Sequence, residues 1–436
     1  MIRLVLLLLG ARTLRPFWIA LLALGLTWLV LGTWLLVNLT SREIVYIEDT
    51  LAIFIALEGT VRVLHALALG LRQYWGEFVR GLCFLLAGFL VFNVQWDHNM
   101  GATIVFGAAF LADGFLRIGS AYVLRGRRLR NNLIYGFISV LLALLILLRW
   151  PLPYEVTVAF CLALLFLSSG FVLVSAALQL HRLPPGGSVT SLPIYSNVNW
   201  QARGIAVPLL EFIPAPMLGE LNVRVWTATG SITDPERRLL VDRYVAAVDR
   251  KGVVSTGHSA LEIPGEMYIS HYPAVELDHS PDELQSILHS GPKNDVTGRF
   301  QPSLAVETTA WCPPDQTVRF HRFNKDALLG FWQLYSTDNT YNLTARNCST
   351  TVVSALDAAT EGLASHGNPL RDVLLLLLNP DFWILRLIRG RAEAMTWTPG
   401  LVLDYAVLLN KVLEHGDRRW RRRFASAFSA KGTRSK

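Results

Sequence analysis

Long apolar runs fill the first 180 residues of the chain, and shorter segments with alternating polar positions follow them. An α-helix needs about 20 consecutive apolar residues to cross the hydrocarbon core of a bilayer. Six runs meet this requirement, and they cover residues 17–38, 45–70, 74–93, 101–124, 131–149 and 154–180. The pattern therefore predicts an all-α transmembrane bundle of six helices.

The six predicted helices repeat as three pairs. Gly59, Gly114 and Gly170 are separated by 55 and 56 residues, which places one glycine at the same depth of every second helix. A fixed period of this length indicates an internal repeat. Glycine at such a position allows two helix backbones to approach closely. We therefore expect three helix-pair repeats.

Two of the three copies carry opposite charges beside the glycine. Glu58 is followed by Arg62, and Asp113 by Arg117, whereas the copy around Gly170 has lost both charges. Charged side chains inside a span face the bundle interior or a polar pathway. The pairs either line a polar route, which would suggest transport, or form two i,i+4 ion pairs that neutralise each other.

This arrangement of helix pairs, with an acid-Gly-x-x-Arg or small-residue signature in each second helix, resembles the HdeD-like acid-resistance membrane protein family. The resemblance covers roughly residues 10–182 and depends on the threefold repeat. It implies an association with acid stress, and no defined chemistry.

Composition and charge agree with a membrane protein and indicate its orientation. The chain is 52% hydrophobic and 17% charged, unlike an ordinary soluble protein of 436 residues. Cytoplasmic loops of membrane proteins are rich in Lys and Arg. Arginines gather near the N-terminus, after the second and fourth predicted spans and near the C-terminus: Arg3, Arg12, Arg15, Arg72, Arg80, Arg125, Arg127, Arg128, Arg130, Arg418, Arg419, Arg421, Arg422 and Arg423.

These clusters favour a multi-pass protein of the bacterial inner membrane with a cytoplasmic C-terminal domain. The lipid bilayer is its expected partner. Nucleic-acid binding is not expected, because no basic fold or aromatic ladder accompanies the arginines. The oligomeric state is left open by the sequence.

The polar half divides into segments of different character. We expect a transmembrane domain over 1–182, a Pro/Gly-rich linker over 183–194, and an α+β domain over 195–365. An amphipathic helical, membrane-proximal segment over 366–425 and a disordered basic tail over 426–436 complete the plan. The amphipathic segment has two interpretations, helices lying on the membrane surface with Trp383 at the interface, or a helical hairpin buried in the domain.

Alternation and capping residues predict the elements of the α+β domain. Strands are expected over 219–226, 252–263, 266–272 and 317–323, and helices over 324–335 and 348–359 with a further helix opening at Asp234.

Cys348 stands where a polar loop becomes the last of these helices. Free N–H groups and the helix dipole stabilise a thiolate there. His258, on a predicted strand, is a candidate general base, and His271 is a candidate group to orient it. Glu262, on the same face as His258, is a rival for that third position.

Three motifs carry a second resemblance. Gly-His-Ser at 257–259, Tyr-x-x-His at 268–271 and Tyr-Asn-Leu-x-x-x-Asn-Cys-Ser-Thr from 341 look like the Lnb N-terminal periplasmic domain family and, more distantly, permuted papain-like enzymes of NlpC type. The resemblance implies a papain-like fold over 195–365, with Cys348 as nucleophile, His258 as base and His271 as its orienting group.

By the same analogy Asn347, or backbone N–H groups near Cys348, would form the oxyanion hole. The family is usually periplasmic, whereas the loop charges place this domain in the cytoplasm. Either the domain acts on the side of the inner leaflet, or the number of spans differs by one from six.

The resulting prediction is a membrane-anchored cysteine hydrolase or acyltransferase that needs no cofactor or metal. A position against the bilayer suggests a lipid, lipoprotein or other membrane-proximal substrate carrying an amide or ester. The alternative is a non-enzymatic membrane protein of stress type, in which Cys348 is structural and the polar half is a binding or assembly module.

Overall fold

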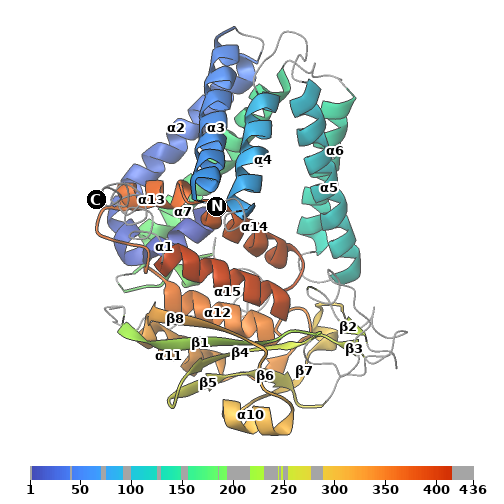
Figure 1. Ribbon diagram of the computed structural model, residues 1–436, viewed down its shortest axis with the longest axis vertical. Coiled ribbons are helices and arrows are strands. Elements are labelled where there is room, and N and C mark those ends of the chain that lie inside the picture. The colour runs from blue at the N-terminus through green and yellow to red at the C-terminus, as the bar shows by residue number, and fades with distance from the viewer. Residues whose placement is uncertain are drawn as a thin grey trace, which may run out of the picture. The chain divides into compact units, whose positions relative to one another are not determined.

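The computed structural model describes residues 2–39, 42–69, 75–91, 100–124, 129–148, 156–184, 186–193, 217–229, 244, 247–248, 254–275 and 288–414 (Figure 1). The chain forms two compact units. Unit 1 contains Met1–Trp18, Ser120–Leu129 and Ala177–Lys436, and unit 2 contains Ile19–Gly119 and Arg130–Ala176.

Helices occupy all six ranges predicted as spans. They are α2 (Trp18–Val37), α3 (Arg42–Leu69), α4 (Trp75–Val91), α5 (Met100–Leu124), α6 (Leu129–Leu147) and α7 (Thr157–Arg182). Within the described residues, four stretches are long and apolar enough to cross a membrane, namely Ile2–Val37, Thr103–Leu124, Leu129–Leu147 and Thr157–Arg182. The membrane character is therefore confirmed, while α3 and α4 as spans, and with them the six-span bundle, stay a prediction.

Glycines pair the helices of unit 2. A Cβ added to Gly59 would lie 2.8 Å from the carbonyl oxygen of Gly81 on α4, and one added to Gly81 would lie 2.9 Å from that of Gly59. Contact this close between backbones requires glycine on both helices, because any side chain would overlap the neighbouring helix.

The same reciprocal contact occurs twice more. Gly114 on α5 faces Gly136 on α6, and Gly170 on α7 faces Gly25 on α2. Each second helix of a repeat therefore packs against the first helix of the next, and the last repeat returns to the first.

The charged pairs of unit 2 are ion pairs along single helices. Nη2 of Arg62 lies 2.6 Å from Oε1 of Glu58, and Nε of Arg117 lies 2.6 Å from Oδ2 of Asp113. Ser139 on α6 also donates to Asp113 at 3.2 Å. This is the geometry expected if the two charges of each pair neutralise each other. A polar route through the bundle stays a hypothesis.

An antiparallel sheet forms the centre of unit 1, with strand order β5-β4-β1-β8. Its strands are β1 (Met217–Trp226), β4 (His258–Ile263), β5 (Met267–Ile269) and β8 (Gln316–Phe323). Register pairs Trp226 with His258 and Val223 with both Leu261 and Val318. Smaller sheets join β6 (His271–Pro273), β7 (Val296–Phe300) and β9 (Thr340–Tyr341), and β2 (Ala247–Val248) with β3 (Val254–Ser255).

Helices α12 (Cys348–Thr360) and α15 (Pro399–Glu414) pack along the sheet (Figure 1). Helix α11 (Lys325–Tyr335) packs against α12, and the short α10 (Leu304–Ala310) lies at the end of the unit away from α13 (Pro369–Leu377). Helix α14 (Pro380–Ala394) packs against both α13 and α15. The sheet with its helices confirms the coarse expectation of a sheet-containing C-terminal region.

The apolar N-terminal helix α1 (Ile2–Leu14) belongs to unit 1 and not to the membrane half in which sequence analysis placed it. Leu7, Leu8 and Leu9 are completely buried. The carbonyls of Leu7 and Leu8 accept hydrogen bonds from the backbone N–H groups of Gly362 and Ala364, both at 2.9 Å. Helix α1 is thus part of the core of the same unit as the sheet.

Most predicted elements of the polar half are present. The strand over 252–263 is divided at Gly257, and that over 266–272 at Ser270. Three predicted segments lie outside the described residues, namely the helix at Asp234, the linker beyond Pro193 and the basic tail. Of the clustered arginines, the structure describes only Arg3, Arg12, Arg15, Arg80 and Arg130.

Candidate active site around Cys348

Cys348 is the first residue of α12, as predicted, and a capping box holds it there. The side chain of Asn347 accepts a hydrogen bond from the Thr350 N–H at 2.8 Å, and the Thr350 hydroxyl accepts one from the Asn347 N–H at 2.8 Å. This reciprocal pattern satisfies two of the N–H groups that a helix start leaves free. It fixes the thiol in the first turn, where the helix dipole favours negative charge.

Asn347 does not have the arrangement expected of an oxyanion-hole donor. Its Nδ2 donates to the carbonyls of Leu343 and Trp397, at 2.8 and 3.0 Å. Both amide hydrogens are thereby used on backbone acceptors. Asn347 is therefore a capping residue that also ties the loop before α12 to the segment before α15.

A tight turn places His258 at the start of β4. The preceding Gly257 has φ of 70°, and a Cβ there would overlap the carbonyl oxygen of Trp226. Only glycine adopts this conformation so close to another backbone. The imidazole that follows is 3% exposed and stacks on the Tyr272 ring, with centroids 4.0 Å apart.

The structure brings Cys348 and His258 together. The sulfur lies 3.8 Å from the Ser349 hydroxyl, and the His258 imidazole and the Ser259 N–H lie near enough to act on its pKa. Burial raises the pKa of the Cys348 thiol, but the charge of His258 and these polar neighbours outweigh it, so that the pKa lies below its usual value. A sulfur with a lowered pKa beside an imidazole is the arrangement of an activated nucleophile.

Glu307, which the sequence analysis did not identify, faces the other side of the imidazole. Its Oε1 lies 3.4 Å from Nε2 of His258, and the Ser270 hydroxyl lies 2.9 Å from the same nitrogen. The hydroxyls of Tyr268 and Tyr272 each donate to the Glu307 carboxylate at 2.7 Å. A buried carboxylate held in this way fixes the ring orientation of His258.

The two tyrosines stay protonated and therefore act as donors. Burial, followed by the charge of Glu307, raises the pKa of both Tyr268 and Tyr272. Glu307 lies in the first turn of α10, which Ser303 caps. No spacing motif connects this short helix with His258, so the sequence offers no signal beyond a lone acid in an apolar segment.

His271 lies apart from the orienting position predicted for it. Its Nδ1 is 3.2 Å from the Thr351 hydroxyl, and its Nε2 is 3.3 Å from the Asn339 carbonyl. Burial is the main cause that lowers its pKa from 6.5 to about 3. With both nitrogens occupied and the ring neutral, His271 connects β6, α12 and the β9 region. Glu307 and Ser270 occupy the place next to His258.

The rival candidate Glu262 is paired elsewhere. Its Oε2 lies 2.7 Å from Nη2 of Arg224 on β1. The cross-strand pair lies within the sheet, four residues from His258, and has no part in the site.

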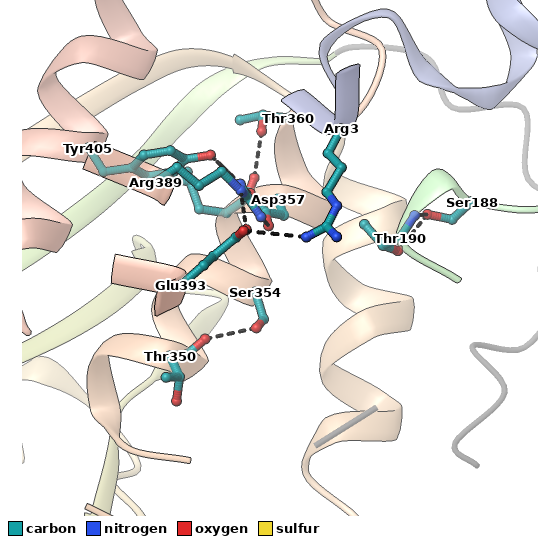
Figure 2. A network of polar contacts seen from close by, with 11 residues as sticks. Arg3, Ser188, Thr190, Thr350, Ser354, Asp357, Thr360, Arg389, Glu393 and Tyr405 are labelled. Atoms are coloured by element: carbon teal, nitrogen blue, oxygen red, sulfur yellow. Dashed lines mark hydrogen bonds and ion pairs between the residues drawn. The ribbon is translucent and has the colours of Figure 1, made fainter. Parts of the chain in front are cut away.

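A second buried network holds the far half of α12 (Figure 2). Arg389 donates two hydrogen bonds to Asp357, at 2.8 and 2.7 Å, and one to the Tyr405 hydroxyl at 2.6 Å. It also contacts Glu393, which lies 3.6 Å from Arg3 of α1. A bidentate pair of this kind fixes α12 against α14 and α15. Helix α12, which begins at Cys348, is therefore anchored at both ends.

Within the described part of the chain, no group of His, Cys, Asp and Glu residues has an arrangement that would hold a metal ion. Comparisons with protein-family models, with curated proteins and with solved structures gave no significant match. The interpretation of the site consequently depends on its geometry.

Proposed function

We propose that this chain is a membrane-anchored cysteine hydrolase or acyltransferase that acts on an amide or ester close to the bilayer. The observation that carries the proposal is the buried chain of Cys348, His258 and Glu307. A helix start, a strand and a second helix hold these three groups in sequence, as nucleophile, base and orienting acid require. A papain-like relationship is supported by a nucleophile-bearing helix that packs on an antiparallel sheet.

The reaction has two steps. The sulfur of Cys348 attacks the carbonyl carbon and forms a C–S bond. The C–N or C–O bond to the leaving group then breaks, and His258 gives its proton to that group. In the second step water, an amine or an alcohol attacks the thioester, His258 accepts the proton of that nucleophile, and the C–S bond breaks.

Backbone groups supply the oxyanion site in this proposal. The N–H groups in the first turn of a helix have no acceptor within the helix, and those of Cys348 and Ser349 lie beside the sulfur. They also lie at the positive end of the α12 dipole. They take the role that the resemblance suggested for Asn347 or for backbone groups.

The three segments of the chain that make up unit 1 support an even number of membrane crossings between them. Met1–Trp18, Ser120–Leu129 and Ala177–Lys436 belong to one compact unit, so they share one side of the membrane. A chain that leaves this unit must return to the same side. This agrees with four spans, α2 to α5, between the first and second segments, and two spans, α6 and α7, between the second and third. Arg3, Arg12 and Arg15 belong to this unit, and the charge rule makes its side the cytoplasm of a bacterial cell.

Site-resolved alkylation tests the proposed nucleophile. The full-length protein in detergent is treated with iodoacetamide across a range of pH, and mass spectrometry measures modification of each cysteine. This small reagent suits a residue that is 7% exposed. Cys312 is the matched internal control, because burial, followed by the charge of Asp315, raises its pKa.

Cys348 is expected to react faster than Cys312 near neutral pH and to lose that advantage in His258→Asn. Reaction of Cys348 only after unfolding, with His258→Asn unchanged, would show a structural thiol. That result would favour the non-enzymatic alternative.

A further inference from the structure

An apolar surface lies on the outer faces of α13 and α14. Both helices bury one side in unit 1, through residues such as Leu376, Phe382 and Leu385. On the opposite side large apolar residues are exposed. We call these residues the α13–α14 patch: Leu370, Leu374, Leu375, Leu378, Trp383 and Leu387.

The patch is continuous along and between the two helices. Leu370, Leu374 and Leu378 recur at every fourth residue, which places them on one helix face, and Leu370 and Leu378 are each 72% exposed. The indole N–H of Trp383 donates to the Leu377 carbonyl at 2.7 Å, so the first turn of α14 lies against the end of α13. Clustered exposed leucines of this kind mark a surface that contacts another apolar phase.

The position of α13 identifies that phase. Helix α13 packs against α1, and the Thr13 hydroxyl lies 2.8 Å from the Ser365 hydroxyl just before α13. Only the turn Arg15–Phe17 separates α1 from α2, the start of the long apolar helix that enters the membrane. The start of α13 is therefore tied to the point at which the chain enters the bilayer.

The residue types also fit a lipid surface. Leucines insert at the boundary between head groups and acyl chains, and tryptophan prefers the same depth because its ring is apolar and its N–H polar. Exposed Arg371 stands beside Leu370 at the edge of the patch, and a basic side chain at such a position is suited to anionic head groups.

We propose that the α13–α14 patch lies in the interfacial layer of the bilayer that the same chain spans. Unit 1 is then held at the lipid surface by the patch as well as by its covalent connections. The proposal is independent of the chemistry of Cys348, because α13 and α14 contain no residue of the candidate site and the patch is on their exposed side.

Depth-dependent quenching tests this proposal. A small environment-sensitive fluorescent amino acid is introduced at Leu370, Leu378 or Leu387 in the full-length protein, which is reconstituted in nanodiscs of phosphatidylcholine and phosphatidylglycerol. Lipids with a nitroxide near the head group or deep in the acyl chain serve as quenchers. Val306, 47% exposed on α10 at the far end of unit 1, is the matched control position.

Shallow nitroxide lipids are expected to quench the three patch positions roughly threefold more than position 306, as an interfacial helix requires. Leu374→Glu with Leu378→Glu is expected to reduce the quenching at 387, with an unchanged near-UV circular dichroism spectrum showing that unit 1 is folded. Quenching at the patch no greater than at 306 would overturn the proposal. So would protection from lipid combined with crosslinking between two copies, which would identify a protein interface.

Discussion

Glu307 places its Oε1 3.4 Å from Nε2 of His258, and both side chains are almost completely buried. The charge of His258 lowers the pKa of the Cys348 thiol, and this effect depends on how the imidazole is oriented. The sulfur thus depends on Glu307 through the ring that the carboxylate holds in place.

Replacing Glu307 by Gln tests this dependence. The amide keeps the shape and its oxygen still accepts one of the two tyrosine hydrogen bonds, while its NH2 group faces the other hydroxyl as a donor and the negative charge is removed. We expect the alkylation rate of Cys348 at neutral pH to fall by about 10- to 100-fold, with the acidic limb of the pH–rate profile moved to higher pH. Glu262→Gln, which removes a carboxylate from the same face of β4, is the control and should leave the profile in place. An unshifted limb in Glu307→Gln would exclude the orienting role.

His271 makes unit 1 sensitive to acid. Its pKa is about 3 in the folded chain and 6.5 ordinarily, so between these values the unfolded chain binds a proton that the folded chain does not. The free energy of unfolding therefore falls as the pH drops from 6.5 toward 3, by at most about 1.4 kcal/mol per pH unit from this residue. Thermal unfolding at several pH values measures the slope.

The variant His271→Phe cannot bind that proton, so we expect a shallower slope at acid pH even if the variant is less stable throughout. His321→Asn, at an exposed position of β8, should keep the original slope. A slope in His271→Phe equal to that of the unmodified protein would assign the acid sensitivity to other groups.

The buried leucines of α1 contribute to the stability of unit 1. Leu7→Ala leaves a cavity in the core and should lower the free energy of unfolding by about 2–5 kcal/mol. Val306→Ala, at a half-exposed apolar position, should change it by less than about 1 kcal/mol. Chemical unfolding in detergent, followed by near-UV circular dichroism of unit 1, compares the two. Equal effects would mean that α1 is not part of this core.

The glycine contacts of unit 2 make an equally specific prediction. In Gly114→Leu the new side chain meets Val140 and the Gly136 carbonyl on α6, and the helices must separate at a cost of about 1–3 kcal/mol. Gly119 lies on the same helix with nothing within 4 Å of an added Cβ, so Gly119→Leu should be harmless. Thermal stability in one detergent distinguishes the two, and equal losses would disprove close packing at Gly114.

Local signals in the sequence predicted the parts of the structure that local physics determines. Alternation along 316–323 produces a strand because one face of it is buried. The helices that follow Asn324 and Asn347 begin where expected. The glycine period correctly indicated close helix contacts. The position of Cys348 and its proximity to His258 followed from the order of elements and from a motif.

Features that depend on distant packing were not accessible in the same way. Leu4–Leu9 is apolar, and hydropathy alone does not distinguish burial in lipid from burial in a protein core; the hydrogen bonds to Gly362 and Ala364 decide it. Glu307 lies beside His258 only because the fold brings α10 next to β4, and no local pattern in the sequence predicts that contact. The resemblance suggested Asn347 or backbone N–H groups for the oxyanion hole, and the sequence gives no sign that the Asn347 amide donates to Leu343 and to Trp397, fifty residues away.

The contact between α1 and the segment at Gly362 also constrains how the chain assembles. Leu7 emerges from the ribosome long before Gly362, and the helices of unit 2 are translated in the interval. During that time the apolar face of α1 lacks the partners that it has in the folded chain. The core of unit 1 therefore joins the first and the last parts of the chain to be made, and it closes only after the helices of unit 2 have been translated.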